Sequence, residues 1–452
     1  MELKALQNGF RGEVLTPDSA GYEDARKIWN GMIDRRPAAI ARCTGPADVV
    51  AAVRFAADQD LYPAVRGGGH NVAGLAMVED GLVIDVSQMK GIFVDPTHRT
   101  ATAQTGLTWG EFDRETHLRG LATTGGLIST TGIAGLTLGG GVGWLMGKCG
   151  LVCDNTLSYE VVLANGELIH ANATEHSDLF WALKGGGGNF GVVTSITYRL
   201  YPITTVISGM ILYPVGQGRD VLRYYRDFVM AGLPDELIVY AAALSTPDGQ
   251  SVIGIMPTWC GEIREGEKIL QPIRKYGSPI ADLVTTMPYP SLQQMLDAAA
   301  PFGVRSYWKS AFLRELPDNA IDTFIDFAKS RTSPRSFVTL EHAHGAMSRV
   351  APDATAFPNR TASFDFVVIG IWSSPEEDAR HIKWTREFYS AMQPWVAGSV
   401  YVNALDQDDG SRVAEAYGAN FPRLCAVKAV YDANNRFQRN QNLRPKTQAA
   451  RQ

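Results

Sequence analysis

The chain has 452 residues, 45% of them apolar and 20% charged, so it can bury a large core and divide into two or three domains. Its net charge of −5 and sequence pI of about 5.9 leave no basic surface for nucleic acid. No run of about 18 apolar residues predicts a membrane span, and the first eight residues lack the apolar core of a signal peptide. We therefore expect a cytoplasmic protein with neither nucleic-acid nor membrane partners.

The cysteines indicate neither a disulfide framework nor a metal site. There are five, an odd number scattered at positions 43, 149, 153, 260 and 425 of a long chain. Cys149 and Cys153 lack the two-residue spacing and the companion ligands of a zinc site. We expect semi-buried thiols there and no metal.

The first predicted elements lead to a glycine loop. Apolar residues at helical spacing behind Pro46 predict a helix over 46–58, and the apolar stretch 61–65 predicts a strand. This strand runs into Arg66-Gly67-Gly68-Gly69-His70. Residues without a β-carbon let backbone amides close around a diphosphate, and a neutral imidazole beside them can bond covalently to a cofactor ring.

Short strands and two more glycine runs follow. Apolar or alternating stretches at 82–86, 92–95 and 100–105 predict a mixed sheet, and Asn165-Gly166 predicts a two-residue hairpin. The run 125–143 is rich in small and hydroxyl residues, which can wind closely over a large flat ligand.

The third glycine run, 185–191, contains the pattern G-x-G-x-x-G. A helical pattern precedes it and a strand pattern follows it, whereas a Rossmann fingerprint requires a strand, then the glycines, then a helix. We therefore exclude a Rossmann site.

From about residue 203 the glycine runs stop. Strand-like and helical segments then alternate, with longer helices predicted near 216–230 and 317–330. This change of character marks a second domain, extending to about residue 398, which we expect to shape a substrate pocket.

In their order and spacing, these motifs resemble the FAD-linked oxidases of the vanillyl-alcohol-oxidase superfamily, with their PCMH-type FAD-binding fold. Within it they are most similar to the berberine-bridge-enzyme-like group and its singly tethered, 6-hydroxynicotine-oxidase-like branch. The segments that carry the resemblance are Arg66 to His70, Thr131 to Gly143, Leu163 to Gly166, Trp181 to Val193, Tyr401 to Asn403, Tyr431 to Phe437 and Asn440 to Asn442.

The resemblance implies an α+β fold with three segments. A two-part FAD-binding domain of PCMH type would span 1–205. A substrate-binding domain with an antiparallel sheet and flanking helices would span 206–398, and a C-terminal segment, 399–452, would return to the FAD domain.

The resemblance also implies FAD bound covalently through His70. Many members have a second tether, a cysteine four residues before the glycine that opens the second run, but Ile128 stands at that position here. We therefore expect a single bond, and a bulky sugar substrate is less expected. The implied cofactor-binding residues are Arg66, Gly67, Gly68, Gly69, His70, Asn71, Gly74, Gly126, Ser129, Thr130, Thr131, Gly132, Gly135, Leu136, Gly140, Gly141, Gly143, Gly191, Val193, Tyr401, Asn403, Asn440 and Gln441.

The proton acceptor departs from the usual pattern of the family. Many relatives have a tyrosine directly after the asparagine of a Tyr-x-Asn-Tyr motif, as the base or its anchor. This chain has Tyr401-Val402-Asn403-Ala404, so that role cannot be carried over. Asn403 either hydrogen-bonds the ring or the substrate, or only ends a strand.

Asp365 is the first candidate for the proton acceptor. Other relatives use a glutamate on a strand after a Phe-Pro-His-Arg motif, and the matching stretch here is Phe357-Pro358-Asn359-Arg360. Asp365 lies opposite that glutamate if one residue is skipped. Strand alternation turns Asp365 away from its aromatic neighbours, and partial burial would raise the pKa of its carboxyl toward the useful range. A structural role is the alternative.

Two further strands carry candidates. Alternation puts Tyr307 and Lys309 on one face, where they would orient the substrate, or Lys309 would accept a proton. Further along, either Glu341 or the pair His342 and His344 points inward. The His-x-His spacing lacks an evident third ligand, so we again expect no metal.

The predicted function is oxidation of an alcohol or amine carbon of a small molecule by hydride transfer to FAD, which O2 then reoxidises to give H2O2. The alternatives are a dehydrogenase with another electron acceptor and a catalytically degenerate flavin-binding protein. The substrate and the oligomeric state stay open: ring-bearing natural products, hydroxylated N-heterocycles and short sugars all fit.

Overall fold

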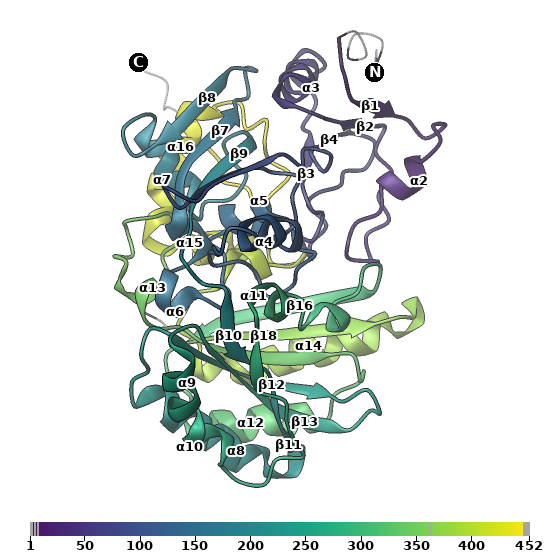
Figure 1. The fold of residues 1–452 in the computed structure, drawn as a ribbon. Coiled ribbons are helices and arrows are strands. Elements are labelled where there is room, and N and C mark those ends of the chain that lie inside the picture. The colour runs from purple at the N-terminus through teal and green to yellow at the C-terminus, as the bar shows by residue number, and fades with distance from the viewer. Residues whose placement is uncertain (1–2, 4–5, 7–8, 362, 446–452) are drawn as a thin grey trace.

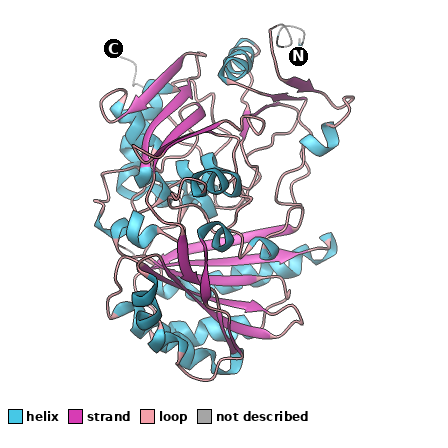
Figure 2. Cartoon of the chain, in the orientation of Figure 1, coloured by secondary structure: helices cyan, strands magenta, loops and turns pink. Residues whose placement is uncertain are grey.

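The computed structural model describes residues 3, 6, 9–361 and 363–445. Three sheets follow one another through the molecule, with helices between and around them (Figures 1 and 2). This arrangement confirms the predicted α+β fold. The limits predicted for the three segments stay predictions, and positions 446–452 of the last lie outside the described residues.

The first sheet presents the glycine loop. Its order is β1-β2-β4-β3, with β4 parallel to both β2 and β3. Helix α3 starts with Pro46 in its first turn and buries Val49, Ala52, Val53 and Ala56. It leads to β3, whose carboxyl end opens into the loop. The bounds are β1 Glu13–Leu15, α2 Tyr22–Ala25, β2 Ala39–Arg42, α3 Pro46–Asp58, β3 Ala64–Arg66 and β4 Leu82–Asp85.

The second sheet is antiparallel, in the order β5-β6-β9-β7-β8. The predicted turn at Asn165-Gly166 joins β7 to β8, and Gly166 takes the positive φ of 77° that such a turn favours. The bounds are β5 Ile92–Asp95, β6 Thr100–Gln104, α4 Trp109–His117, α5 Ile133–Leu138, α6 Met146–Cys149, β7 Thr156–Val162, β8 Leu168–Asn172, α7 Ser177–Leu183 and β9 Val192–Arg199.

The third sheet forms most of the lower half of the molecule (Figure 1). Its main path is β14-β11-β13-β12-β17-β18-β16, with β10 paired to β13 and β15, and all of these pairs are antiparallel. The strands are β10 Thr205–Ser208, β11 Ile211–Pro214, β12 Leu237–Ser245, β13 Ser251–Trp259, β14 Ala281–Asp282, β15 Thr285–Pro288, β16 Arg305–Leu313, β17 Phe337–His342 and β18 Phe364–Trp372.

Helices cover one face of this sheet and leave the other to the upper half. Val338 and Leu340 of β17 and Phe366 and Val368 of β18 pack with α8, α12 and α14 in one apolar core. Because strand residues alternate, their neighbours face the opposite way. The helices are α8 Gly218–Met230, α9 Ile263–Ile269, α10 Gln271–Arg274, α11 Tyr289–Gln293, α12 Asp318–Lys329, α13 Ala346–Arg349 and α14 Asp378–Met392.

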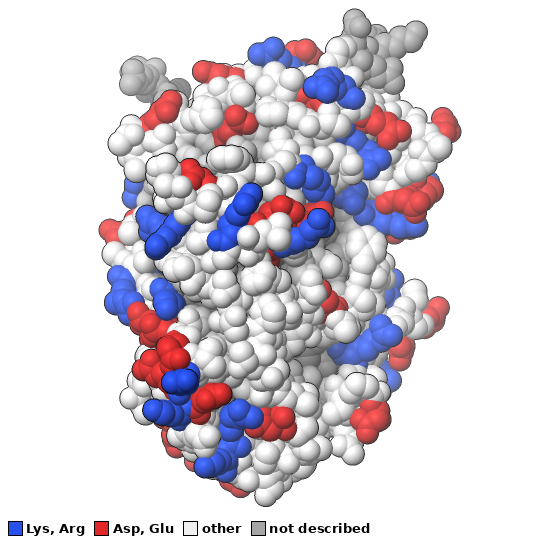
Figure 3. Space-filling view, viewed as in Figure 1, with Lys and Arg blue, Asp and Glu red and all other residues white. Residues whose placement is uncertain are grey.

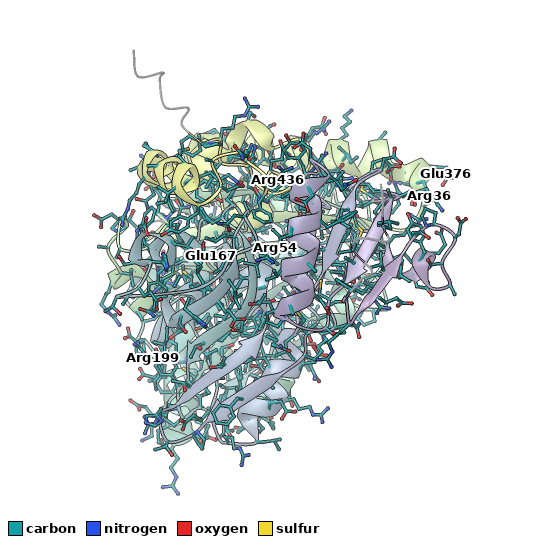
Figure 4. The ribbon with its side chains drawn as sticks, turned by 90° about the horizontal axis from the view of Figure 1, so that it is seen from above. Arg36, Arg54, Glu167, Arg199, Glu376 and Arg436 are labelled. Carbon is teal, nitrogen blue, oxygen red and sulfur yellow. The ribbon has the colours of Figure 1, made fainter. Side chains whose placement is uncertain are left out.

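The C-terminal segment returns to the upper half, where α16 packs against α7 (Figure 1). Seen from above, Arg436 of the tail lies beside helix α3, on the same side of α3 as Arg54 (Figure 4). Arg436 Nη1 donates to the Leu61 carbonyl at 2.8 Å, which ties the tail to the segment just before β3. The remaining helices are α15 Val413–Tyr417 and α16 Phe421–Tyr431, with short 3-10 helices at Val152–Asn155, Val215–Gln217, Asp297–Ala299, Pro375–Glu377, Gln393–Trp395, Val402–Ala404, Gly410–Arg412 and Gly418–Asn420.

The surface agrees with the composition. Acidic and basic side chains are interspersed on the face seen in Figure 3. In the part of the chain that the structure describes, no helix has the length and apolar character needed to cross a membrane.

Candidate active site

A cavity of about 350 Å³ lies where the three sheets and the tail meet. The glycine loop after β3, the second glycine run and the tail form one part of its lining. The helix-free face of the large sheet forms another. The predicted cofactor motifs and the predicted substrate domain therefore border the same space.

The two glycine loops touch through their backbones. A β-carbon at Gly68 would lie 2.5 Å from the Gly132 nitrogen, and one at Gly132 would lie 2.5 Å from the Gly68 nitrogen. Any larger residue at either position would push the loops apart. This close contact explains why glycine is needed in both runs, although they lie about 60 positions apart.

His70 presents a neutral imidazole at the cavity. Its ring stacks on the indole of Trp29, with centroids 4.6 Å apart and an angle of 19° between the planes. The surrounding protein lowers the pKa of His70 to about 4, because it disfavours the charged form. Within the described residues, Nε2 of His70 has no hydrogen-bond partner. The imidazole is thus uncharged, as a covalent cofactor link requires, and its buried Nε2 is not engaged by the protein.

Ile128, at the position of the second tether, also lines the cavity. None of the described residues in that lining is a cysteine, and Cys149 and Cys153 are buried elsewhere. The single tether stays a prediction.

The tail contributes Phe437, Arg439, Asn440 and Gln441 to the cavity lining. The Asn440 amide donates to the Gly188 carbonyl at 3.1 Å, and the Asn189 amide donates to the Gln441 carbonyl at 3.2 Å. The third glycine run thus holds the tail in place.

Most of the predicted cofactor residues line the cavity, but seven do not. Those that do are Gly67, Gly68, Gly69, His70, Asn71, Gly126, Thr131, Gly132, Gly135, Leu136, Gly191, Val193, Tyr401, Asn403, Asn440 and Gln441. Those outside the lining are Arg66, Gly74, Ser129, Thr130, Gly140, Gly141 and Gly143.

Each of these seven residues, three with side chains and four glycines, has surroundings other than the cavity. Arg66 donates to the Ala25 carbonyl. Ser129 is engaged by Asp297, to which its amide donates at 2.8 Å and its hydroxyl at 2.6 Å. Thr130 is exposed. We therefore withdraw direct cofactor contact for these side chains.

The four glycines in this group are packing positions. The Gly74 carbonyl accepts from Arg35, and the Gly141 amide donates to the Tyr401 hydroxyl at 3.0 Å. A β-carbon at Gly140 would lie 2.6 Å from the Phe357 ring, and one at Gly143 would lie 1.7 Å from the Gly125 carbonyl oxygen. Gly140, Gly141 and Gly143 thus pack the second glycine run against its neighbours, and Gly74 packs the loop after His70.

Tyr401 and Asn403 are fixed against that run. The Asn403 amide donates to the Leu136 carbonyl at 3.2 Å and to the Tyr401 hydroxyl at 2.9 Å. A β-carbon at Gly139 would lie 2.0 Å from Asn403 Oδ1, so glycine is required there. Both side chains line the cavity, and Asn403 lies in a 3-10 helix rather than at the end of a strand.

Asp365 and Glu341 form a pair of carboxyls in the cavity wall. They are register partners on β18 and β17, with only 2% and 7% of their surface exposed. Burial and the neighbouring Glu341 charge raise the pKa of Asp365 well above its usual range. Burial raises the pKa of Glu341 to about 7, opposed by a hydrogen bond from the Thr339 hydroxyl at 2.9 Å. Glu341 lines the cavity whereas His342 and His344 do not, so Glu341 is the inward-facing candidate on β17.

His342 and His344 lie outside the cavity lining. Their rings stack 5.0 Å apart, and His344 Nε2 lies 2.8 Å from the Leu237 carbonyl oxygen. Among the described residues, no three His, Cys, Asp or Glu side chains are grouped to hold a metal ion. The His-x-His pattern belongs to the packing behind the strand.

Tyr307 and Lys309 face away from the cavity, and we withdraw them as substrate-orienting residues. The Tyr307 hydroxyl donates to Asp408 at 2.6 Å, and Lys309 Nζ lies 2.6 Å from Asp408 and 2.7 Å from Asp409. Burial alone would lower the pKa of Lys309, but the contacts with Asp408 and Asp409 outweigh it and the pKa is raised. The two residues do share one face of the strand, as predicted, but this face points away from the cavity.

The sequence did not predict several of the residues that line the cavity. Trp29 is 41 positions before His70, and no local pattern links the two. Others follow from strand alternation once Glu341 and Asp365 are placed in the wall. The residues of this second kind are Phe337, Thr339, Val367, Ile369 and Ile371, joined by Trp308 of β16.

Known proteins share both the motifs and the fold. Residues 37–172 match the family model of an FAD binding domain, and residues 400–444 match the model described as berberine and berberine like. An FAD-linked oxidoreductase of Dictyostelium discoideum is 30% identical over 96% of this chain and 95% of its own. The uncharacterized FAD-linked oxidoreductase YvdP of Bacillus subtilis is 32% identical over 96% of this chain and 98% of its own.

The fold comparison leads to the same family. The crystal structure of 6-hydroxy-D-nicotine oxidase from Arthrobacter nicotinovorans matches with a TM-score of 0.89 and 27% identity, over 97% of this chain and 99% of that one. Together with the glycine loops, His70 and the returning tail around one cavity, these matches show an enzyme that uses FAD. The chain belongs to the berberine-bridge-enzyme-like FAD-linked oxidoreductases.

Proposed function

We propose that the protein is an oxidase that removes a hydride from an alcohol or amine carbon of a small molecule, with FAD bound covalently through His70 and O2 as the final electron acceptor. The observation that carries the proposal is the neutral His70 imidazole at the cavity wall, beside the two touching glycine loops. These residues fit FAD because glycine amides suit a diphosphate and an uncharged imidazole suits a covalent link.

In this proposal FAD supplies the hydride acceptor, and the protein holds it and prepares the substrate. The backbone of Gly67, Gly68 and Gly132 would hold the diphosphate. Tyr401 and Asn403, fixed against the second glycine run, would border the flavin ring.

The carboxyl pair supplies the proton acceptor that the missing tyrosine after Asn403 leaves open. A hydride leaves a carbon readily only as the attached oxygen or nitrogen loses its proton. Asp365 lies in the cavity wall with an elevated pKa. Glu341 lies beside it, and its pKa is also raised, so either carboxyl can hold the proton. Removal of the substrate proton by this pair is part of the proposal.

The test is whether flavin stays with the denatured polypeptide. After acid precipitation, we expect yellow pellets from the wild type and from His98→Ala, a change at an exposed histidine. His70→Ala should release its flavin into the supernatant. A colourless wild-type pellet would exclude the tether, and covalent flavin left in His70→Ala would show another link.

The electron acceptor needs a separate measurement. Protein reduced by substrate or by dithionite should consume O2 and form H2O2 in an oxygen-electrode assay. Slow reoxidation by O2 with fast reoxidation by a quinone dye would favour the dehydrogenase alternative. Failure of a broad substrate panel to bleach the flavin would favour a degenerate flavin-binding protein.

A further inference from the structure

The cavity face of the large sheet carries a row of side chains across four strands. Tyr240 of β12 is the register partner of Glu341, Glu341 of Asp365, and Asp365 of Phe312 on β16. Register partners project from the same face of a sheet, with β-carbons about 5 Å apart. The two carboxyls therefore lie side by side, between two aromatic residues.

No described basic side chain forms an ion pair with either carboxyl of this pair. Both oxygens of Asp365 have no hydrogen-bond partner within the described residues, and Glu341 accepts only from Thr339. Lys309, the nearest lysine along β16, points to the opposite face and is already bound by Asp408 and Asp409. A buried negative charge without a counterion is costly, which is why the pKa of both carboxyls is raised, and a cationic ligand would stabilise their ionised form.

The wall around the pair is apolar. Trp308, Phe337, Val367, Ile369 and Ile371 line it. The hydroxyl of Thr339 is already committed to Glu341. A sugar would lose hydrogen bonds from several hydroxyls to water without replacement against this wall, whereas the carbon skeleton of a small amine would not.

We propose that Glu341 and Asp365 together form the recognition site for an ammonium group, and that the substrate is a small apolar amine rather than an alcohol or a sugar. This inference rests on the proposed function for its substrate class, since oxidation of the bound amine needs the flavin, whereas recognition of the ammonium group is tested separately. It adds the substrate class and gives Glu341 a role as a substrate-binding residue.

The pair would also take part in the reaction. One N–H proton of the bound ammonium moves to the carboxylate, which leaves a neutral amine. With FAD as the hydride acceptor, the adjacent C–H bond would break as a hydride and the substrate would leave as an iminium ion. Water hydrolyses the iminium ion to a carbonyl compound and the remaining amine.

A matched ligand pair tests recognition without relying on turnover. N-methylbenzylamine is a cation at pH 7.5, and benzyl methyl ether has nearly the same shape without the charge. We would titrate both into the anaerobic flavin-loaded wild type by calorimetry. The expected result is at least tenfold tighter binding of the amine. Equal affinity of the two ligands for the wild type would overturn the proposal.

Variants connect the preference to the pair. Glu341→Gln with Asp365→Asn removes both ionisable carboxyls at nearly constant shape, and we expect the preference to fall to near one. Asp113→Asn, which changes a buried carboxyl outside the cavity lining, should keep the wild-type preference. A double variant that still prefers the amine by tenfold would contradict the assignment.

The inference and the proposed function fail in different ways. If benzyl alcohol bleaches the flavin and no amine does, the ammonium site is wrong while the oxidase stands. If the purified protein carries no flavin but prefers the amine by tenfold, the proposed function is wrong while the ammonium site stands.

Discussion

The indole of Trp29 stacks on the imidazole of His70, 4.6 Å away, and is itself anchored to the opposite half of the molecule. Its Nε1 donates to the Ala300 carbonyl at 2.9 Å, and its backbone amide donates to the Gly69 carbonyl at 3.0 Å. The orientation of the proposed flavin-binding histidine thus depends on a contact between the glycine loop and the segment before β16.

Removing this stack should slow covalent attachment of FAD. A stacked aromatic pair contributes about 0.5–1.5 kcal/mol beyond its buried area, which corresponds to roughly a 2- to 10-fold change in rate if the stack is needed for attack. We expect Trp29→Ala to slow flavinylation of apoprotein by about that factor or more. In-gel flavin fluorescence after denaturation, sampled over time, gives the rate.

Trp29→Phe is the matched control, because it keeps an aromatic ring over His70. It should flavinylate close to the wild-type rate, and both variants should bind FAD noncovalently at first. If Trp29→Ala attaches flavin as fast as the wild type, the stack has no part in positioning His70.

Asp365→Asn should lower the rate of flavin reduction at saturating substrate by roughly a hundredfold, because a proton acceptor contributes about 10²–10⁴ to rate. Anaerobic stopped-flow absorbance with saturating amine measures this step. Asp18→Asn, an exposed carboxyl, serves as the control. A reduction rate within a few-fold of wild type would remove Asp365 from the mechanism.

The same experiment across pH tests Glu341. Its pKa is about 7, so the pair gains negative charge as the pH rises through neutrality. In the wild type we expect the reduction rate to increase between about pH 6 and 8. In Glu341→Gln this rise should disappear or shift, and an unchanged profile would show that Glu341 does not set it.

How much of this site was predictable from sequence depends on the range of the interaction. The glycine loops, His70 and the tail motifs are local patterns that can be read from neighbouring residues. Few other residues can replace glycine where two backbones come so close. The placement of Asp365 follows from alternation along one strand. The sequence therefore predicts each of these features, together with the fold class.

The predicted roles that the structure does not support depend on contacts between segments far apart in the sequence. Alternation correctly grouped Tyr307 with Lys309, but only strand pairing and the helices on one side decide which face meets the cavity. The partnership of Glu341 with Asp365 depends on the register of β17 against β18. Ser129 was expected at the cofactor, and its actual partner, Asp297, lies 168 positions further along.

Asp113 should make stability depend on pH independently of the active site. It is 1% exposed on α4, and burial raises the pKa of its carboxyl to about 8, with the neighbouring Gln293 acting in the opposite direction. Because its folded-state pKa is above its unfolded one, its contribution to stability is complete below about pH 4. That contribution is lost as the pH rises through about 8.

Asp113→Asn cannot ionise and should escape this loss. We expect its melting temperature to exceed that of the wild type by several degrees at pH 9, with the difference shrinking toward pH 5. Differential scanning fluorimetry across that range measures it, with Asp18→Asn as the exposed control. A difference that does not grow with pH would contradict the shifted pKa.

The tail offers the last prediction, because one buried ion pair holds it in place. Lys428 Nζ lies 2.5 Å from Asp432 and donates to the Asn189 carbonyl at 2.6 Å, and both side chains of the pair are fully buried. Asp432 also accepts from the backbone amide of Phe437 at 2.8 Å. The pair therefore joins α16, the third glycine run and the cavity-lining tail.

Asp432→Ala leaves the Lys428 ammonium buried without its counterion, which costs about 3–5 kcal/mol. We expect the tail to detach and flavin incorporation to be lost, as it should be when residues from Arg436 onward are deleted. Asn434→Ala, an exposed change two positions away, should incorporate flavin normally. The ratio of flavin to protein absorbance in the purified, folded variants measures this, with circular dichroism confirming the fold. A truncated protein that is fully flavinylated would show that Asn440 and Gln441 are not needed at the cofactor.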